Sequence, residues 1–289
     1  TLGACSDDDD GPVVPPTPEP PAAPVNVSVS AQDAALSVSW NASANATSYI
    51  VQRQLAAGGQ AFSNLADNVS STSYVDSSVE AGQGYNYRII AVGEGGQSNP
   101  SDPAYGEIGL RLADIGGTIT GVRQLSADTI YTIEGLLIVD DGGELRIPAG
   151  TLLLGSTDVQ PTAVIVRKGG KIFSEGTADA PVVFTSAAPV GQRNRGDWGG
   201  IVLNGQSLCN FPAGECVGEG NSGEYGGTVV DDNSGRMVYT RIEFAGFEVS
   251  FGNELNALTM NGVGSGTELH HIQTHYGSDD GFEWFGGTV

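Results

Sequence analysis

The first part of the chain alternates hydrophobic and polar residues with a period of two. Leu36, Val38 and Trp40 fall on one face of such a run, and serines separate them. The longest alternating run covers residues 85–92. This period is typical of half-buried β-strands, and several short strands separated by turns predict a β-sandwich. We expect this domain to span residues 25–106.

The remainder of the chain consists of short apolar runs that end at glycine or a polar turn residue. Residues 163–166 read Ala-Val-Ile-Val before a turn, and residues 201–205 read Ile-Val-Leu-Asn-Gly. Few stretches have helical periodicity, and 43 of the 289 residues are Gly, twice the usual frequency of about 7%. Repeated short strands without helices predict a solenoid of stacked coils. We expect residues 112–289 to form a right-handed parallel β-helix with an insertion at 206–236.

The alternative for this half is a second sandwich. That fold needs tight hairpin turns, and only Asn204-Gly205 and Asn261-Gly262 offer the favoured dipeptide. The predicted fold class is therefore all-β, with a sandwich followed by a β-helix.

Residues 25–106 resemble the fibronectin type III domain. The resemblance rests on the strand that ends in Trp40, the strand Tyr49–Arg53 and the run from Gly84 to Val92. It implies that Trp40 lies in the core and that Tyr85 forms a tyrosine corner. Both roles are structural, so the resemblance implies a spacer or a binding platform.

The second half resembles a family of bacterial outer-membrane lipoproteins that carry a β-helix. The motifs that carry this resemblance are Gly196–Gly205, Tyr225–Gly227, Asp232–Gly235, Arg241–Gly246 and Asp279–Gly287. The function of that family is poorly understood, so the resemblance implies fold and location more than chemistry.

The N-terminus carries a motif that resembles the lipobox of bacterial lipoproteins. Leu2 stands three residues before Cys5, and four aspartates and a proline-rich stretch follow. The resemblance implies that residues 1–4 are a signal-peptide remnant and that Cys5 carries a lipid anchor. Residues 5–24 would then be a disordered acidic tether. Because Ser6 rather than aspartate follows the cysteine, the resemblance favours the bacterial outer membrane or cell surface.

The ends of the chain suggest a fragment. It starts without Met and ends directly after a strand-like run. We therefore expect the β-helix to be incomplete at its C-terminus.

Charge disfavours one class of partner. The chain has 34 acidic and 12 basic residues, a formal net charge of -22. Nucleic-acid binding requires basic side chains that displace counterions from phosphates. The sequence therefore predicts no nucleic-acid partner.

Two cysteines remain after Cys5 is assigned to the anchor. Cys209 and Cys216 flank a turn-rich loop, and no other Cys or His pair lies near them at metal-ligand spacing. In an oxidising compartment this pattern predicts a disulfide.

The sharpest catalytic candidates are Asp279 and Asp280. With the preceding glycine and serine they are similar to the Gly-x-Asp-Asp turn of β-helical polygalacturonases, in which paired carboxylates act as acid and base. Residues 256–261, about one coil upstream, lack the further carboxylate of that family. The alternative is a turn in which aspartates cap backbone amides or face solvent.

The three histidines do not predict a shared metal ion. His271 and His275 fall on one strand face but lie roughly 13 Å apart at about 3.3 Å per residue. On a regular strand His270 points to the other face.

Aromatic and acidic residues give two weaker candidates. Trp284 is a candidate sugar platform because Phe282 and Trp284 would share a face with Asp280, and His275 is a second ligand-binding candidate; core packing is the alternative for the aromatic residues. The aspartate pairs Asp231-Asp232 and Asp279-Asp280 could bind calcium, which takes oxygen ligands. No other cofactor is expected.

The sequence thus predicts an exported, lipid-anchored surface protein. We expect a non-catalytic role, which is adhesion or the binding of polysaccharide or another extracellular polymer. If the chain is an enzyme, we expect a polysaccharide hydrolase or lyase that uses Asp279 and Asp280.

Overall fold

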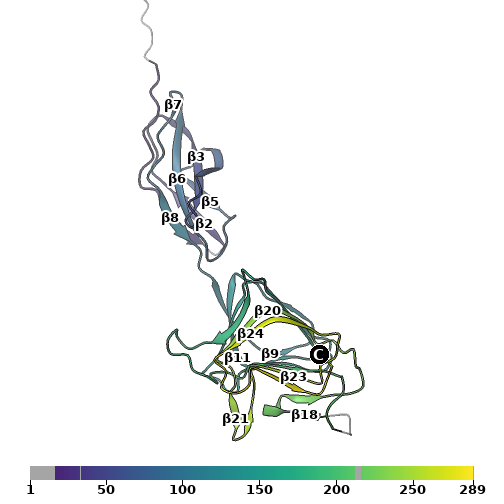
Figure 1. The fold of residues 1–289 in the computed structure, drawn as a ribbon. Helices are drawn as coiled ribbons and strands as arrows, with labels where there is room; N and C mark the ends of the chain where they lie inside the picture. Colours follow the sequence, from purple (N-terminus) through teal and green to yellow (C-terminus); the bar gives the residue numbers. More distant parts are fainter. Residues whose placement is uncertain (1–16, 33, 212–215, 289) are drawn as a thin grey trace, which may run out of the picture. The chain divides into compact units, whose positions relative to one another are not determined.

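The computed structural model describes residues 17–32, 34–211 and 216–288 (Figure 1). The chain divides into two compact units, Thr1–Gly109 and Leu110–Val289. Cys5 and the aspartate run lie outside the described residues. In the part of the chain that is described, no helix is long and apolar enough to cross a membrane. The predicted all-β fold class is confirmed, since the only helix among the described residues is one short 3-10 turn.

The first unit is a sandwich of two antiparallel sheets. One sheet has the order β1-β2-β5, and in the other β3 and β6 form the centre with β4, β7 and β8 beside them. The strands are β1 (Ser28–Gln32), β2 (Ala35–Ser39), β3 (Ala46–Leu55), β4 (Ser63–Val69), β5 (Ser73–Asp76), β6 (Gly84–Gly93), β7 (Gly96–Gln97) and β8 (Ala104–Glu107).

Alternate side chains along these strands point inward and form the sandwich core. Leu36 and Val38 are fully buried, and Trp40 lies edge-on to Tyr49 with ring centroids 5.3 Å apart. The hydroxyl of Tyr85 accepts a hydrogen bond from the backbone amide of Glu80 at 3.0 Å. This is the contact that a tyrosine corner requires, so both aromatic residues have the structural roles expected for them.

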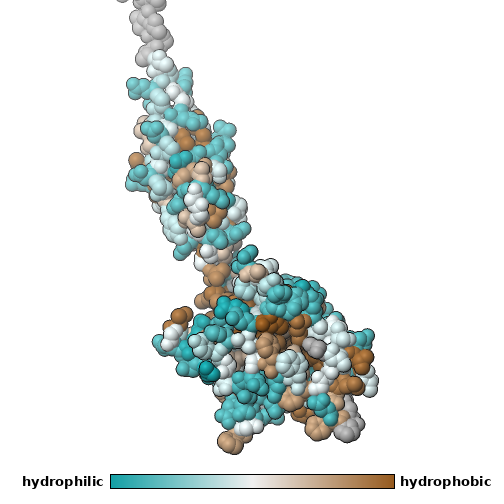
Figure 2. All heavy atoms as spheres, in the orientation of Figure 1, coloured by the Kyte–Doolittle hydropathy of each residue, from teal (hydrophilic) through white to brown (hydrophobic). Residues whose placement is uncertain are grey.

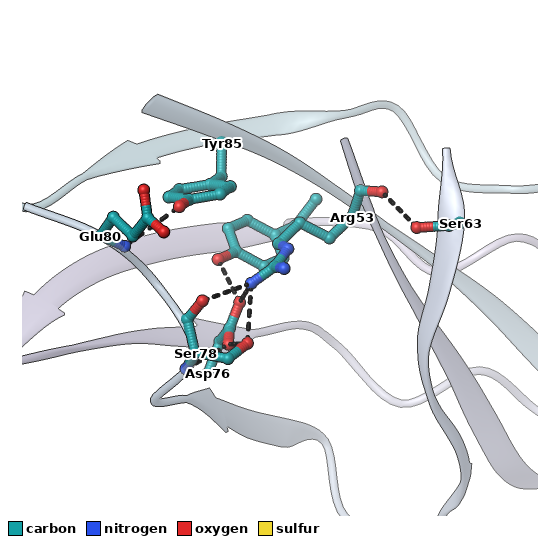
Figure 3. Close-up of polar contacts among 7 residues, drawn as sticks. Arg53, Ser63, Asp76, Ser78, Glu80 and Tyr85 are labelled. Carbon is teal, nitrogen blue, oxygen red and sulfur yellow. Dashed lines mark hydrogen bonds and ion pairs between the residues drawn. The ribbon is translucent and has the colours of Figure 1, made fainter. Parts of the chain in front are cut away.

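A buried ion pair lies at one edge of the sandwich core (Figure 3). Arg53 Nη1 and the hydroxyl of Tyr87 each donate to Asp76 Oδ2 at 2.7 Å, and the amide and hydroxyl of Ser78 donate to Asp76 Oδ1. The Asp76 side chain is 1% exposed. Burial alone raises its pKa, but the hydrogen bonds from Ser78, Tyr87 and Arg53 outweigh it and hold the pKa below 3.8.

The second unit is a parallel β-helix whose 13-stranded sheet folds into three flanks. Flank A contains β10, β12, β15 and the first halves of β20 and β24. Flank B contains the first halves of β9 and β11, then β13, β16 and the second halves of β20 and β24. Flank C contains the second halves of β9 and β11, then β14, β17, β23 and β25. Because every pairing in these flanks is parallel, the alternative of a second sandwich is wrong.

The strands of the flanks are as follows. They are β9 (Arg111–Ile119), β10 (Val122–Gln124), β11 (Thr129–Val139), β12 (Glu144–Pro148), β13 (Leu152–Gly155), β14 (Ala163–Val166), β15 (Lys171–Glu175), β16 (Val182–Ser186), β17 (Ile201–Asn204), β20 (Gly235–Glu243), β23 (Leu258–Asn261), β24 (Glu268–His275) and β25 (Phe282–Phe285).

Two excursions leave the coils. The first contains β18 (Cys216–Gly218), the 3-10 helix η1 (Glu219–Asn221) and β19 (Gly223–Tyr225), within the insertion expected from sequence. The second is a hairpin of β21 (Glu248–Ser250) and β22 (Asn253–Glu254). The predicted disulfide between Cys209 and Cys216 is confirmed, with Cα atoms 6.4 Å apart.

Inward side chains form rows along the interior of the β-helix. On flank C, Ile201 and Leu203 pair with Leu258 and Met260 of the next coil, and all four are buried. Trp198 is fully buried, stacks on Phe184 with centroids 6.2 Å apart, and donates its indole N–H to the carbonyl of Glu243. These rows give each coil the buried inner face that it cannot form alone.

The Asn-Gly dipeptides are not hairpin turns. Asn204 and Asn261 are fully buried on adjacent coils, and Asn261 Nδ2 donates to Asn204 Oδ1 at 2.9 Å. The two residues form a short polar stack at the end of flank C.

Candidate functional site

Five carboxyl groups from separate segments face one region of the β-helix, which we call the acidic corner. Glu219 comes from η1, Glu254 from β22, Asp279 and Asp280 from the turn before β25, and Glu283 from β25. Their electrostatic interactions connect Glu219 with Glu254 and Asp279, and Glu283 with Glu219, Asp279 and Asp280. The insertion, the hairpin and the last coil therefore meet there.

Asn256 fixes the turn that carries the two aspartates. It is fully buried, its Oδ1 accepts the backbone amide of Asp280 at 2.9 Å, and its Nδ2 donates to the Glu283 carboxylate. The carbonyl of Asp280 accepts from the amide of Ala257 at 3.1 Å. This asparagine stands where the sequence lacks the upstream carboxylate of polygalacturonases, and it holds the two acidic segments in a fixed relation.

The setting of the acidic corner raises the pKa of two of its carboxyl groups, Glu283 and Glu219. Burial raises the pKa of Glu283 to about 7, and the negative charges of Glu219, Asp280 and Asp279 add to the effect, while Asn256 opposes it. Burial together with Glu254 and Asp279 also raises the pKa of Glu219 above 4.5. Glu283 can therefore hold a proton near neutral pH, which is the condition for a carboxylic acid that donates one.

Three aromatic rings lie where β20 and β24 end, and we call them the aromatic shelf. Phe244 and Tyr276 stack with centroids 5.5 Å apart and planes 13° apart, and His275 lies 4.1 Å from Tyr276. Tyr276 is 52% exposed. Phe244 and Tyr276 directly follow β20 and β24, and both have left-handed backbone angles, φ 58° and 52°. The two corners are equivalent in successive coils, so their side chains stack outward.

Two arginines border the aromatic shelf. Arg195 lies over the ring of Tyr276 at 5.9 Å and donates to the carbonyl of Gly277, and Arg193 lies over Phe244 at 6.0 Å. A side chain at Gly246, which has φ +100°, would come within 2.9 Å of the amide nitrogens of the turn that holds Asp279. Close backbone packing therefore seats this turn on the preceding coil.

The predicted site residues fall in two places. Asp279, Asp280 and His275 are exposed and lie along the turn that joins the aromatic shelf to the acidic corner. Trp284 instead continues an interior row, because it pairs with Met260 in register, and Phe282 pairs with Leu258. These two rings stack 6.2 Å apart at the end of the β-helix.

The last interior rows border a cavity of about 290 Å³, lined by Leu258, Met260, Leu269, His270, His271, Ile272, Phe282 and Trp284. Figure 2 shows hydrophobic residues gathered within the ring of strands that carries the C-terminus. Trp284 is 56% exposed, and it lines this cavity rather than the acidic corner.

The prediction that His270 and His271 face opposite ways is wrong. His271 has a left-handed backbone, φ 57°, and the pairing of β24 with β20 skips it. The strand bends at this residue, and the bend turns the two rings together, so that the Nδ1 atoms lie 2.8 Å apart. Tyr239, which has φ 44° on the neighbouring coil, stacks on His271 at 4.3 Å.

The two acidic pairs considered for calcium differ in setting. Asp232 is buried, its carboxylate accepts from the backbone amides of Gln206, Gly264 and Asn233, and burial raises its pKa above 3.8. Asp231 is exposed. Among the described residues, no three His, Cys, Asp or Glu side chains group as metal ligands.

Sequence reasoning missed Glu219, Glu254 and Glu283 as partners of the predicted aspartates. The first two lie in excursions whose contacts depend on the coil register, which no local pattern reveals. Phe244 and Tyr276 had a detectable signal, because each is an aromatic residue directly after a strand of successive coils.

Known families account for both halves of the chain. The family profile described as "Pectate-lyase like beta helix domain" matches residues 117–289, and the fibronectin type III profile matches residues 20–107. No curated protein is significantly similar to this chain.

Solved structures are similar over about a third of the chain. A fibronectin III-like protein from Clostridium thermocellum is 29% identical over 31% of this chain and 92% of its own, with a TM-score of 0.26. The twitchin kinase region from C. elegans is 32% identical over 32% of this chain and 17% of its own, with a TM-score of 0.27. A structure titled "Myokine structure" is 25% identical over 31% and 98%, with a TM-score of 0.28.

Proposed function

The chain belongs to the pectate-lyase-like β-helix domain family, and from this premise we propose that it is a cell-surface lipoprotein that binds neutral polysaccharide without cleaving it. A fibronectin type III domain joined to this β-helix supports a polysaccharide-related extracellular protein. The role at the surface, the anchor and the ligand class are the parts that we propose.

The observation that carries the binding role is the aromatic shelf beside the acidic corner. Sugar rings stack their C–H faces on exposed aromatic rings, and Tyr276 is half exposed although Phe244 stacks on it and Arg195 lies over its ring. Carboxylates of Asp279 and Asp280 are exposed at the next turn, where they can accept hydrogen bonds from sugar hydroxyls. A fixed aromatic face with adjacent acceptors suits a polymer that lies along the outer surface.

Charge selects the class of polysaccharide. Five carboxyl groups crowd the acidic corner, and the whole chain has a net charge of -22. A uronic-acid polymer would bring like charge to this region, which costs binding free energy. Arg193 and Arg195 offset only part of that charge, so a neutral glycan is the favoured ligand.

The disulfide agrees with an exported protein. The bond between Cys209 and Cys216 is of a kind that persists in oxidising compartments. We propose that Cys5 carries the acyl chains and that the outer membrane or cell surface is the location; calcium at the aspartate pairs stays a prediction.

A glycan array tests the ligand class. Purified full-length chain is applied to neutral and uronic-acid polysaccharides at low and high salt. We expect retention on neutral glycans that changes little with salt, because stacking and neutral hydrogen bonds are weakly screened. Retention on uronic-acid polymers alone would contradict the proposal.

The second candidate is a polysaccharide hydrolase or lyase, and one observation favours it. With its pKa near 7, Glu283 resembles a general acid, and the neighbouring Asp279 and Asp280 could act as the base. In this assignment Glu283 donates the proton to the leaving oxygen, a role that the sequence had given to the aspartate pair.

Product analysis separates the two candidates. The chain is incubated with each polysaccharide that it retains, and released oligosaccharides are measured by mass spectrometry. The binding proposal expects intact polymer with wild type and with Glu283→Gln. Oligosaccharides that appear with wild type and vanish with Glu283→Gln would establish the enzyme.

A further inference from the structure

The two histidines brought together by the bend in β24 form an unusual pair. Their Nδ1 atoms lie 2.8 Å apart, although adjacent residues of a regular strand point to opposite faces. The rings are nearly perpendicular, with an interplanar angle of 76°. Both side chains are accessible, since the His270 side chain is 40% exposed and His271 is also exposed.

The groups next to the two histidines determine which ring nitrogens carry a hydrogen. Glu268 Oε1 lies 2.7 Å from His270 Nε2, so this nitrogen carries the hydrogen and Nδ1 of the same ring carries a lone pair. Arg236 Nε holds the other oxygen of Glu268 at 2.8 Å. A carboxylate that binds the far nitrogen of a histidine is the usual support of a metal-ligating imidazole, because it orients the ring and raises its basicity.

The second ring is also held in place. Tyr239 stacks on His271 with centroids 4.3 Å apart and planes 21° apart. His271 Nδ1 must carry a proton to bond the lone pair of His270, or lose it to a cation that both nitrogens share. The neutral ring can move that proton to Nε2, which leaves a lone pair on each of the two Nδ1 atoms.

The separation of the two nitrogens distinguishes between metals. Metal–imidazole bonds are about 2.0–2.1 Å long, so two nitrogens 2.8 Å apart subtend close to 90° at a shared ion. A tetrahedral ion would need a separation of about 3.3 Å at the same bond length. Cis positions at a right angle are typical of the tetragonal sites of Cu(II) and Ni(II), and Cu(II) binds nitrogen ligands most tightly in the divalent series.

From this geometry we propose that His270 and His271 form a Cu(II) site on flank A of the β-helix, with both Nδ1 atoms as ligands and Glu268 as the carboxylate that supports His270. Water completes the coordination, because within the described chain no third His, Cys, Asp or Glu joins the pair. The site lies on β24, is independent of the proposed polysaccharide binding, and uses a different set of residues from the acidic corner.

Calorimetric titration with CuCl₂ tests the site on full-length chain without a histidine tag. The titration is run at about pH 7.5, one unit above the ordinary imidazole pKa. The variants are His270→Gln and His271→Asn, since asparagine tolerates the left-handed backbone that His271 adopts. The matched control is His275→Asn, because His275 is the third and last histidine of the chain and is exposed on the same strand.

We expect one Cu(II) per chain, lost in both variants of the pair and kept in His275→Asn. Glu268→Gln should weaken binding by about 10–100-fold, the usual effect of removing a supporting carboxylate. Electron paramagnetic resonance of the loaded wild type should show hyperfine coupling to two nitrogens, and Zn(II) should bind more weakly than Cu(II).

Three results would overturn the proposal. They are the absence of histidine-dependent Cu(II) binding, an equal loss in His275→Asn, or tighter binding of Zn(II) than of Cu(II). Circular dichroism of each variant shows whether the coils are intact, so misfolding is distinguished from the loss of a ligand. Without histidine-dependent Cu(II) binding, the two rings would form only an imidazole hydrogen bond.

Discussion

Asp76 shows how much of the sandwich depends on one residue. Its carboxylate takes hydrogen bonds from a guanidinium, a phenol and a serine while almost fully buried. No sequence pattern singled it out, because its partners come from β3, β6 and the segment after β5. A buried charge of this kind is stable only while all its partners remain.

Asp76→Asn should lower the free energy of unfolding of the first unit by about 3 kcal/mol, because it leaves Arg53 without its charge partner. Fluorescence of Trp40, the one tryptophan in residues 1–109, reports urea unfolding of this unit; Trp198→Phe and Trp284→Phe remove the other signals. Asp102→Asn, at an exposed aspartate, is the control and should change stability by less than about 0.5 kcal/mol. Equal effects of the two substitutions would contradict the role of the buried pair.

The lowered pKa of Asp76 predicts that the stability of the first unit depends on pH in the acid range. The pKa of Asp76 is lowered in the folded state, so its contribution is complete above 3.8 and is lost as the pH falls through the lower folded pKa. Wild-type stability should therefore fall in that acid range. The slope should be smaller in Asp76→Asn, and an unchanged slope would show that other groups cause the acid response.

Glu283 makes stability depend on pH in the opposite direction to Asp76. Its folded pKa of about 7 is above the ordinary 4.5, so the folded state holds a proton that the unfolded state has released. Stability of the β-helix unit should fall as the pH rises from 4.5 to 7, by on the order of 1–2 kcal/mol after solvent screening, and then level off. Glu283→Gln should remove that decline in denaturant titrations at several pH values. If the decline in stability persists in the variant, a group other than Glu283 causes it.

At the scale of elements, the positions of strands could be predicted from the sequence, but how the runs join into longer strands and flanks could not. Apolar runs ended by glycine marked β14 and β17, and each lies in the expected place. Residues 241–243 are the end of β20, which starts at Gly235 and bends between two flanks at Tyr239. Such a bend depends on the pairing of neighbouring coils, which a local hydrophobic pattern does not contain.

The same limit explains the placement of Trp284. Alternation put Phe282 and Trp284 on one face, as the structure does. Which face is interior depends on register with Leu258 and Met260, two residues about one coil away. The sequence pattern therefore showed that the two residues share a face, but not that this face is interior.

The disulfide loop is an element whose contribution can be measured. Cys209 and Cys216 close a loop with a sequence separation of 7, and the adjacent Leu208 carbonyl accepts from the amide of Gly287 after β25. The double substitution Cys209→Ser with Cys216→Ser should lower the free energy of unfolding of the β-helix unit by about 2 kcal/mol. Urea unfolding of the variant should match that of wild type treated with a reductant. No difference between oxidised wild type and the variant would show that the bond adds no stability.

At the scale of the whole molecule, two domain types were recognisable from their residues. The strand ending in Trp40 and the tyrosine corner identified the sandwich, and glycine-ended strands identified the β-helix. The contacts of the acidic corner could not be predicted in the same way, because they join η1, the β21–β22 hairpin and β25 across long sequence separations.

The lipid anchor is tested on the whole protein in a bacterial host. Labelling with an alkyne fatty acid should mark wild type and not Cys5→Ser, and the variant should leave the membrane fraction. Cys209→Ser with Cys216→Ser is the control and should keep the label. A labelled Cys5→Ser variant, or one that stays with the membrane, would contradict acylation at this cysteine.

The central claim is that polysaccharide binds at the aromatic shelf and not at the end of the β-helix core. Affinity electrophoresis through gels that contain a retained neutral polysaccharide measures this directly, with wild type, Tyr276→Ala and Trp284→Ala run side by side. The account predicts that Tyr276→Ala loses at least about 1 kcal/mol of binding free energy, a fivefold or greater weakening, while Trp284→Ala keeps wild-type retardation. Retardation that survives Tyr276→Ala and disappears in Trp284→Ala would contradict the account.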